Sequence, residues 1–186
     1  MKPKKISLDN LLDLMEPEHK RVALAVRKHF ESKFDVIPGS GANHQAWVGG
    51  YRAHIEEAMN IADFLYDDLH ARRSLPFSKS QALFCVYMHD YDKLQRYQVK
   101  KDGNFTSELY TGRDYLAETQ KQLRSIFNYE LSAEEYNAIK YAHGEGDDYS
   151  KDRRIISPLG TLVHCADIIS ARIWFDDGRN SNAWDD

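Results

Sequence analysis

The chain has 186 residues, of which 42% are hydrophobic and 29% are charged, and its formal net charge is −4. This length and composition suit a single globular domain with a substantial core. The negative net charge argues against a protein that binds nucleic acid through a broad basic face, although a local basic groove is compatible with it.

Two features of the sequence concern location. The basic N-terminus leads into an amphipathic segment without the apolar stretch of a signal peptide, and no apolar run approaches the length of a transmembrane helix. Cys85 and Cys165 both fall in segments that we expect to be buried helices, so we interpret them as packed free thiols rather than a disulfide framework. We therefore expect a cytoplasmic protein that makes no contact with membranes.

The N-terminal part, residues 1–35, predicts two helices that pack on the remainder of the chain. Apolar residues recur at helical spacing over 8–33, and Pro17 interrupts them at a position that suits the first turn of a new helix. His19 and His29 have no acidic or histidine neighbours that suggest a shared site. We expect both to be solvated or at the edge of the core.

The next segment predicts a loop followed by a long helix. Proline and glycine mark a loop over 35–42, and the paired Gly49 and Gly50 permit a tight turn and a close approach of the backbone. A buried face at helical spacing then runs from His54 to about residue 70, with Glu57 one turn after His54.

The most informative stretch is the helix predicted over 78–88. It opens with a capping box formed by Ser78 and Gln81, is apolar nearly all round, and ends in His89 and Asp90. Charged groups at the end of a buried helix are costly unless they are paired or bind a metal. This ending therefore indicates a site rather than a surface.

The remainder predicts more helices. The polar segment 95–112 suits a loop or a short hairpin, and amphipathic helices follow over 113–127 and over 132–143, the second with a capping box from Ser132 to Glu135. A charged loop over 144–154 leads to a core helix that begins at Ser157 and contains His164 and Asp167. Strand signals are weak, so we expect an all-α fold, one compact helical domain with its core over 43–175 and a polar tail over 176–186.

We therefore expect three buried or nearly buried helices to deliver a set of side chains suited to metal binding: His54, His89, Asp90 and Asp167. Two imidazoles and two carboxylates suit a divalent metal of borderline or hard character. Such an ion can lower the pKa of a bound water and polarise a phosphoryl oxygen. The nearby basic residues Lys93, Arg52 and Arg96 favour an anionic substrate such as a phosphate ester.

These motifs, in order, resemble those of the HD-domain superfamily of metal-dependent phosphohydrolases, in particular the subgroup that includes HD-domain exoribonucleases and relaxase-associated proteins. The matching segments are NHQAWVGGYRAH at 43–54, MHDYDKL at 88–94, YAHGE at 141–145 and LVHCADIISAR at 162–172. The resemblance implies a compact helical HD domain. It also implies that the four residues named above bind the metal and that Lys93 contacts the substrate phosphate or the attacking water.

The sequence departs from the family pattern in two ways. Asp92 replaces the usual glycine, and its carboxylate could orient water, bind a second cation or pair with a nearby base. Two-metal members use further histidines after the HD pair, but the span from Tyr91 to Ala142 contains none. We therefore expect one tightly bound divalent ion, with Mn, Co, Ni, Fe, Zn and Mg not distinguished, and His143 serving the substrate or a weak second cation.

Three further histidines have weaker assignments. His44 suits either a role in substrate binding or outer support of the metal, or a role in stabilising its loop. His164, about one turn from Asp167, suits packing or support of a metal ligand, and we expect His70 at the surface.

The leading hypothesis is a phosphohydrolase that cleaves a phosphoester or phosphoanhydride bond of a nucleotide or another phosphorylated small molecule. Lys93 and Asp92 are its candidate catalytic residues, and the candidate substrate-binding residues are His44, Arg52, His143 and Arg96. An HD-type nuclease acting on single-stranded nucleic acid is the nearest alternative. A di-iron oxygenase and a non-catalytic metal-binding module are the others.

Overall fold

The computed structural model describes residues 5–41, 43–100, 105–107 and 115–174. Its elements follow in chain order: α1 (Leu8–Asp13), α2 (Pro17–His29), α3 (Glu31–Phe34), α4 (Gly50–Arg72), α5 (Lys79–Met88), α6 (Tyr91–Arg96), β1 (Tyr97–Val99), β2 (Phe105–Ser107), α7 (Tyr115–Phe127), α8 (Ala133–Lys140), the short 3-10 helix Gly146–Asp148, and α9 (Pro158–Arg172). The predicted all-α fold in one compact domain is confirmed. The expected polar tail over 176–186 lies outside the described residues.

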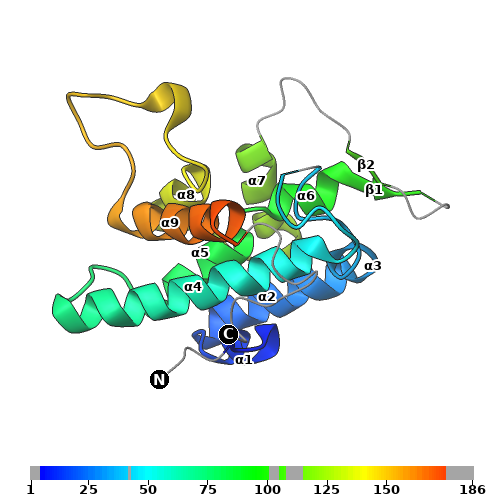
Figure 1. Cartoon of the computed structure of the whole chain (residues 1–186), viewed down its shortest axis with the longest axis horizontal. Coiled ribbons are helices and arrows are strands. Elements are labelled where there is room, and N and C mark those ends of the chain that lie inside the picture. The colour runs from blue at the N-terminus through cyan, green and yellow to red at the C-terminus, as the bar shows by residue number, and fades with distance from the viewer. Residues whose placement is uncertain (1–4, 42, 101–104, 108–114, 175–186) are drawn as a thin grey trace.

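The long helix α4 is the centre of the arrangement (Figure 1). It packs along both α5 and α9, α8 packs on α9, and the N-terminal helices α1 and α2 pack on α4 and α5 respectively. The side chains between these helices form a continuous buried apolar core. Three helices that come from distant parts of the sequence thus meet where the candidate ligands were predicted.

Local sequence signals set most helix ends. The Ser78 and Ser132 hydroxyls each accept a bond from the backbone N–H three residues on, and Gln81 and Glu135 bond back, so both capping boxes are present. Pro17 and Pro158 occupy the first turns of α2 and α9. The polar segment after α6 forms the expected short hairpin, in which β1 and β2 pair antiparallel with Tyr97 opposite Ser107.

Two predicted boundaries differ from the structure. The helix predicted to start at His54 begins at Gly50, because the left-handed Gly49 (φ 80°) turns the chain directly into α4. The helix predicted to run to His143 ends at Lys140, and Gly144 adopts φ 99° just beyond it. This early end frees residues 141–143 to turn toward the candidate site.

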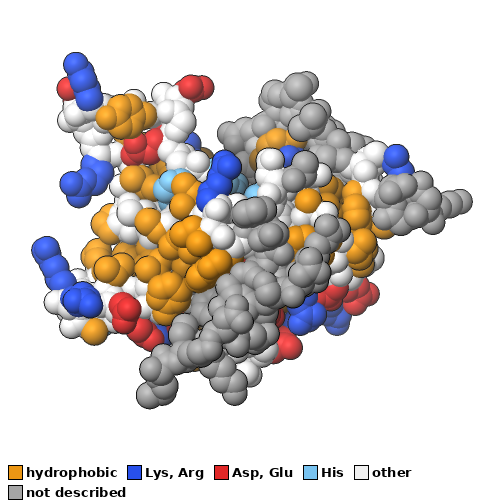
Figure 2. Space-filling model, viewed as in Figure 1, with side chains coloured by type: hydrophobic (Ala, Val, Ile, Leu, Met, Phe, Trp, Pro, Cys, Tyr) orange, Lys and Arg blue, Asp and Glu red, His pale blue; other side chains and the backbone are white. Residues whose placement is uncertain are grey.

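The prediction that both cysteines are buried is wrong for one of them. Cys85 is buried in α5, whereas Cys165 is exposed on α9. The exposed face of α9 lies beside α4, and Figure 2 shows hydrophobic side chains gathered there, with charged side chains of both signs around them. Leu69 and Ile168 are exposed hydrophobic residues of these two helices.

None of the helices in the described part of the chain combines the length and apolar character needed to cross a bilayer.

The prediction that His19 is solvated or at the core edge, without an acidic partner, is also wrong. His19 is only 8% exposed. Its Nδ1 lies 2.6 Å from Ser80 Oγ, and its Nε2 lies 2.9 Å from Glu135 Oε1 and 3.0 Å from the Tyr129 hydroxyl. The acidic partner is 116 residues away in sequence, so local sequence could not reveal it. This network joins α2, α5 and α8.

Replacing Glu135 by Gln is expected to lower the free energy of unfolding by about 1–3 kcal/mol near neutral pH, because a buried charged acceptor is lost. Burial raises the pKa of Glu135, but its bonds with His19 and Ser132 outweigh burial and hold the pKa below the ordinary 4.5. A lowered pKa stabilises the fold above the unfolded-state value, and this stabilisation is lost as the pH falls through the folded-state value. Urea unfolding should therefore give a lower free energy of unfolding for Glu135→Gln than for the wild type above pH 4.5. The difference should shrink progressively as the pH falls below this value. A difference independent of pH would contradict this account.

Candidate metal centre

The four predicted ligands meet at one buried point. His54 comes from α4, His89 and Asp90 from the end of α5, and Asp167 from α9. Their exposed fractions are 0%, 5%, 1% and 6%. A break in the helix brings the pair from α5 into place, because Asp90 leaves the helical conformation (φ −107°, ψ 19°) between α5 and α6. We call these four residues the HD cluster.

The ligand atoms of the HD cluster are spaced as one ion requires. His54 Nε2 lies 3.3 Å from His89 Nε2, 3.2 Å from Asp167 Oδ1 and 3.5 Å from Asp90 Oδ2. His89 Nε2 lies 3.4 Å from each of the same two carboxylate oxygens. Atoms bound at about 2.1 Å to one ion stand roughly 3.0–3.5 Å apart at octahedral or tetrahedral angles. The HD cluster could therefore hold a metal ion.

Outer hydrogen bonds turn both imidazoles toward this point. His89 Nδ1 lies 2.6 Å from the Val86 carbonyl oxygen, which only accepts, so Nδ1 carries the hydrogen and Nε2 faces the cluster. His54 Nδ1 lies 3.0 Å from Ser170 Oγ, and Ser170 in turn donates to Glu57 Oε2 at 2.6 Å. The Gln45 amide also donates to Glu57 Oε2, at 2.9 Å. A carboxylate thus orients His54 through a hydroxyl, an arrangement typical of metal-binding histidines.

Replacing Ser170 by Ala should weaken metal binding by about 10- to 100-fold, because removing an outer partner of a metal-binding histidine has that effect. The fold should persist, since Ala fits the space and keeps the α9 helix. Titration with Mn²⁺ or Zn²⁺ would measure the change. The matched control is Ser74→Ala, whose side chain is exposed outside the helices. Equal metal affinity in the two variants would show that the Ser170 hydroxyl does not support His54.

Electrostatic interactions within the HD cluster keep both of its carboxylates ionised. Burial lowers the pKa of His89, but Asp90 and Asp167 outweigh burial and raise it to about 10. Burial raises the pKa of Asp90, but Lys93 and His89 hold it well below its usual range, and the two histidines hold that of Asp167 low as well. The pKa of His54 is lowered, chiefly by burial. Both carboxylates are therefore ionised, which is the form in which Asp binds a metal, and a bound divalent ion would take the place of the proton on His89.

Lys93 is tied into the HD cluster. Its side chain is buried, and its Nζ lies 2.5 Å from both Asp90 Oδ2 and the Gly39 carbonyl oxygen. The ammonium therefore offsets the charge of Asp90 and joins the cluster to the loop before α4.

Within the described residues, Asp90 Oδ1 and His44 Nε2 are buried near the HD cluster without a hydrogen-bond partner. The nearest charged neighbour of Asp90 Oδ1 is His143 Nε2, at 3.3 Å, and the His143 side chain is 59% exposed. The ring of His44 lies 4.8 Å from that of His54, and burial together with His54 and Lys93 lowers the pKa of His44 to about 4. Buried polar atoms without a hydrogen-bond partner fit a site that takes up a cation or a ligand.

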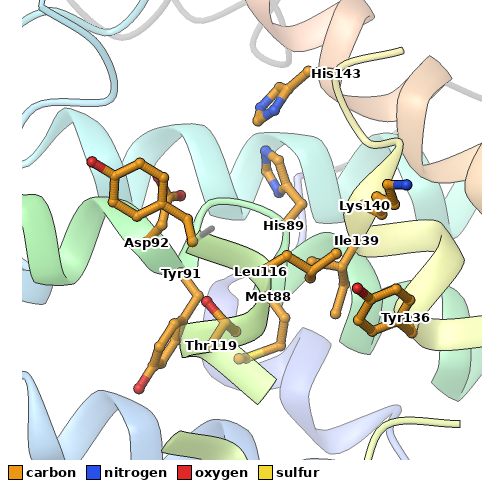
Figure 3. A pocket seen from close by; sticks show the side chains of 11 residues that line it. Met88, His89, Tyr91, Asp92, Leu116, Thr119, Tyr136, Ile139, Lys140 and His143 are labelled. Carbon is orange, nitrogen blue, oxygen red and sulfur yellow. The ribbon is translucent and has the colours of Figure 1, made fainter. Parts of the chain in front are cut away.

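A cavity of about 380 Å³ opens beside the HD cluster. His89 and His143 stand at one end of it and point toward each other (Figure 3). The other lining residues are Met88, Tyr91, Asp92, Tyr115, Leu116, Thr119, Tyr136, Ile139 and Lys140. Arg96 lies behind this wall, with Nε 2.7 Å from Asp92 Oδ2 and the guanidinium over the Tyr115 ring. We call this space the tyrosine-lined cavity.

Other predicted residues are not brought to the site. Arg52 lies two residues before His54, on the opposite side of α4, and its Nη1 contacts Asp35 Oδ1 at 3.1 Å. His164 Nδ1 bonds to the Ala142 carbonyl oxygen at 2.7 Å, which anchors the turn before His143. His70 is exposed and stacks on Tyr66.

Sequence reasoning missed Ser170, Gln45 and most of the tyrosine-lined cavity. Ser170 carries a weak signal, since a buried hydroxyl follows Asp167 by three residues on an apolar helix. The cavity carries none, because its walls come from four separate helices and look like ordinary amphipathic faces.

No family model matches the sequence, and neither a curated protein nor a solved structure matches the chain. What can be said of it therefore rests on its own atoms. The described chain is a helical protein with a buried cluster of histidines and aspartates that could bind a metal, an arrangement compatible with an HD-like fold.

Proposed function

We propose that the chain is a metal-dependent phosphohydrolase of the HD type that hydrolyses a phosphoester or phosphoanhydride bond of a nucleotide or a related substrate. One observation carries the proposal: the Nε2 atoms of His54 and His89 lie 3.2–3.5 Å from each other and from a carboxylate oxygen of Asp90 and of Asp167, next to a cavity of ligand size. Mixed nitrogen and oxygen ligands of this kind suit divalent ions that act on phosphates.

A divalent ion held by the HD cluster would supply an acidified water and polarise the phosphoryl oxygen. The chain's own residues prepare the place for both. Lys93 keeps Asp90 oriented, and the Glu57–Ser170 pair fixes the ring of His54. His143 stands at the exposed rim, where its imidazole can donate a hydrogen bond to an arriving phosphoryl group.

Two further lines support the proposal. The sequence resemblance to HD-domain phosphohydrolases covers four segments in order, and the three that carry predicted ligands are those whose side chains form the HD cluster. Asp92, which the sequence suggested as a catalytic residue, lies in the wall of the adjacent cavity, and Arg96, suggested as a substrate-binding residue, contacts it.

The test is product release from a panel of nucleoside mono- and triphosphates, cyclic dinucleotides and short oligonucleotides, each with Mn²⁺, Co²⁺, Ni²⁺ or Mg²⁺. Asp90→Ala removes a ligand, and Asp147→Asn is the matched control, since Asp147 is exposed in the loop after α8. Turnover that persists in the control and disappears in Asp90→Ala is the expected result.

The identity of the product separates the alternatives. Release of phosphate, pyrophosphate or triphosphate from mononucleotides supports a nucleotide hydrolase, and cleavage confined to oligonucleotides favours a nuclease. Silence across the panel, in protein shown to hold metal, overturns the proposal and leaves the oxygenase and the non-catalytic binding module, which iron content would distinguish.

A further inference from the structure

The tyrosine-lined cavity has two chemically different ends. At one end His89 and His143 border the HD cluster, where a phosphoryl group would be held. Most side chains of the walls beyond them are apolar or aromatic, with Met88, Leu116 and Ile139 among them (Figure 3). The polar members of these walls are Asp92, Thr119 and Lys140. A cavity of about 380 Å³ lies near the lower limit of small-molecule sites, which span roughly 300–1,000 Å³. It therefore has room for one ring system with a sugar rather than for a long chain.

The basic groups at this cavity are already committed to acidic partners. Lys140 Nζ lies 2.6 Å from Asp148 Oδ2, and Arg96 contacts Asp92 from behind the wall. Among the described lining residues, no lysine or arginine is left to neutralise a second or third phosphate. Polyphosphate sites normally supply several such cations. The cavity thus suits an uncharged group.

The aromatic lining favours a flat group. Tyr115 and Tyr136 come from α7 and α8 on separate walls, and Tyr91 lines the cavity while its hydroxyl donates to Gln122 Oε1 at 2.8 Å. Aromatic side chains stack on nucleobases with little dependence on the base, which makes such walls suitable for a nucleoside.

Asp92 is the acidic member of the cavity wall. It follows Asp90 by two residues on α6, and its side chain is 19% exposed. A carboxylate only accepts hydrogen bonds when ionised, so it suits a hydroxyl or amino group of a ligand. Its ion pair with Arg96 also keeps that guanidinium from a further phosphate, so the wall offers such a group no unpaired positive charge.

On the basis of the proposed function, we infer that the tyrosine-lined cavity holds the uncharged aromatic half of a phosphomonoester of nucleoside size. Asp92 is then the specificity residue of the site. It accepts a hydrogen bond from a hydroxyl or amino group of that half, and it disfavours substrates with additional phosphates by keeping Arg96 in an ion pair.

The test compares kcat/KM for nucleoside 5′-monophosphates with that for the matching triphosphates in the wild type, in Asp92→Asn and in the control Asp147→Asn. The wild type and the control should prefer monophosphates. Asp92→Asn should lower kcat/KM for the monophosphate about tenfold, mainly through KM, because a hydrogen bond to a charged acceptor contributes at least that factor. In this variant, the ratio of kcat/KM for the monophosphate to kcat/KM for the triphosphate should fall by a similar factor. A wild type that prefers triphosphates, or an Asp92→Asn variant that behaves like the control, would overturn the inference.

A binding experiment separates this inference from the proposed function. Free nucleosides carry no phosphate, so their affinity, measured by calorimetry without metal, reports on the cavity alone. Asp92→Asn should weaken it, and so should Leu116→Trp, which fills the cavity from α7. If nucleosides bind to the wild type, both variants lower the nucleoside affinity, and no ester is hydrolysed, the inference stands and the proposed function fails. If esters are hydrolysed but nucleosides do not bind, or bind equally in all variants, the inference fails and the proposed function stands.

Discussion

Replacing Asp167 by Asn is expected to abolish tight metal binding and to lower turnover by at least about a hundredfold, more than the loss of an outer partner causes. The reason is the charge balance of the HD cluster. Lys93 offsets the charge of Asp90 at 2.5 Å, whereas Asp167 meets three imidazoles, and no Lys or Arg contacts it within the described chain. Within the described chain only imidazoles offset the charge of Asp167, and imidazoles are neutral when they bind a metal, so this carboxylate supplies negative charge to a bound cation.

Asn has the shape of Asp but carries no charge, so the variant should fold. Its melting temperature in the presence of a chelator checks this, and Asp147→Asn again controls for the loss of one exposed carboxylate. Metal affinity and turnover that stay within a few-fold of the wild type in Asp167→Asn would mean that this carboxylate is not a ligand.

Replacing Gly50 by Ala should produce the largest loss of stability, about 3 kcal/mol, the upper end of the usual cost of overpacking. A Cβ at this position would lie 1.8 Å from the Gln45 carbonyl oxygen and 3.0 Å from the Gly39 nitrogen. Both are backbone atoms and cannot swing away as a flexible side chain can. The displaced loop carries His44 and Gln45, and its Gly39 carbonyl accepts from Lys93, so metal binding should weaken too.

Thermal unfolding measures this effect. A loss of this size lowers the melting temperature by roughly 6–12 °C in a domain of this length. Gly41→Ala is the matched control, because a Cβ there meets no atom within 4 Å. Its melting temperature should stay close to that of the wild type. Similar melting temperatures for the two variants would contradict the close approach of the loop to the start of α4.

Helix positions were predictable wherever the signal is local. Capping boxes at Ser78 and Ser132 and first-turn prolines at 17 and 158 depend on residues within one turn, and each marks a true helix start. The end of α8 was not predictable in the same way. Apolar periodicity continues past Lys140, and only tertiary contacts, such as the bond from His164 to the Ala142 carbonyl, define the turn that follows.

The HD cluster itself was largely predictable because each ligand stands out in its own helix. A charged residue inside or at the end of an apolar helix needs a partner, and His54, Asp90 and Asp167 provide one another with it. Long-range partners could not be predicted. The pairing of His19 with Glu135 and that of Glu57 with Ser170 cannot be derived from local sequence, since 116 and 113 residues separate the members.

The most direct test of the metal centre is the metal content of the purified protein. Bound metal would first be removed from the protein with a chelator. The protein would then be loaded with Mn²⁺, Fe²⁺, Co²⁺, Ni²⁺ or Zn²⁺ in separate samples, desalted, and its metal content measured by inductively coupled plasma mass spectrometry. We expect one ion per chain to survive desalting for at least one of these metals, and none in Asp167→Asn. A wild type that retains no metal, or a variant that retains as much as the wild type, would contradict the assignment of the HD cluster as a metal centre.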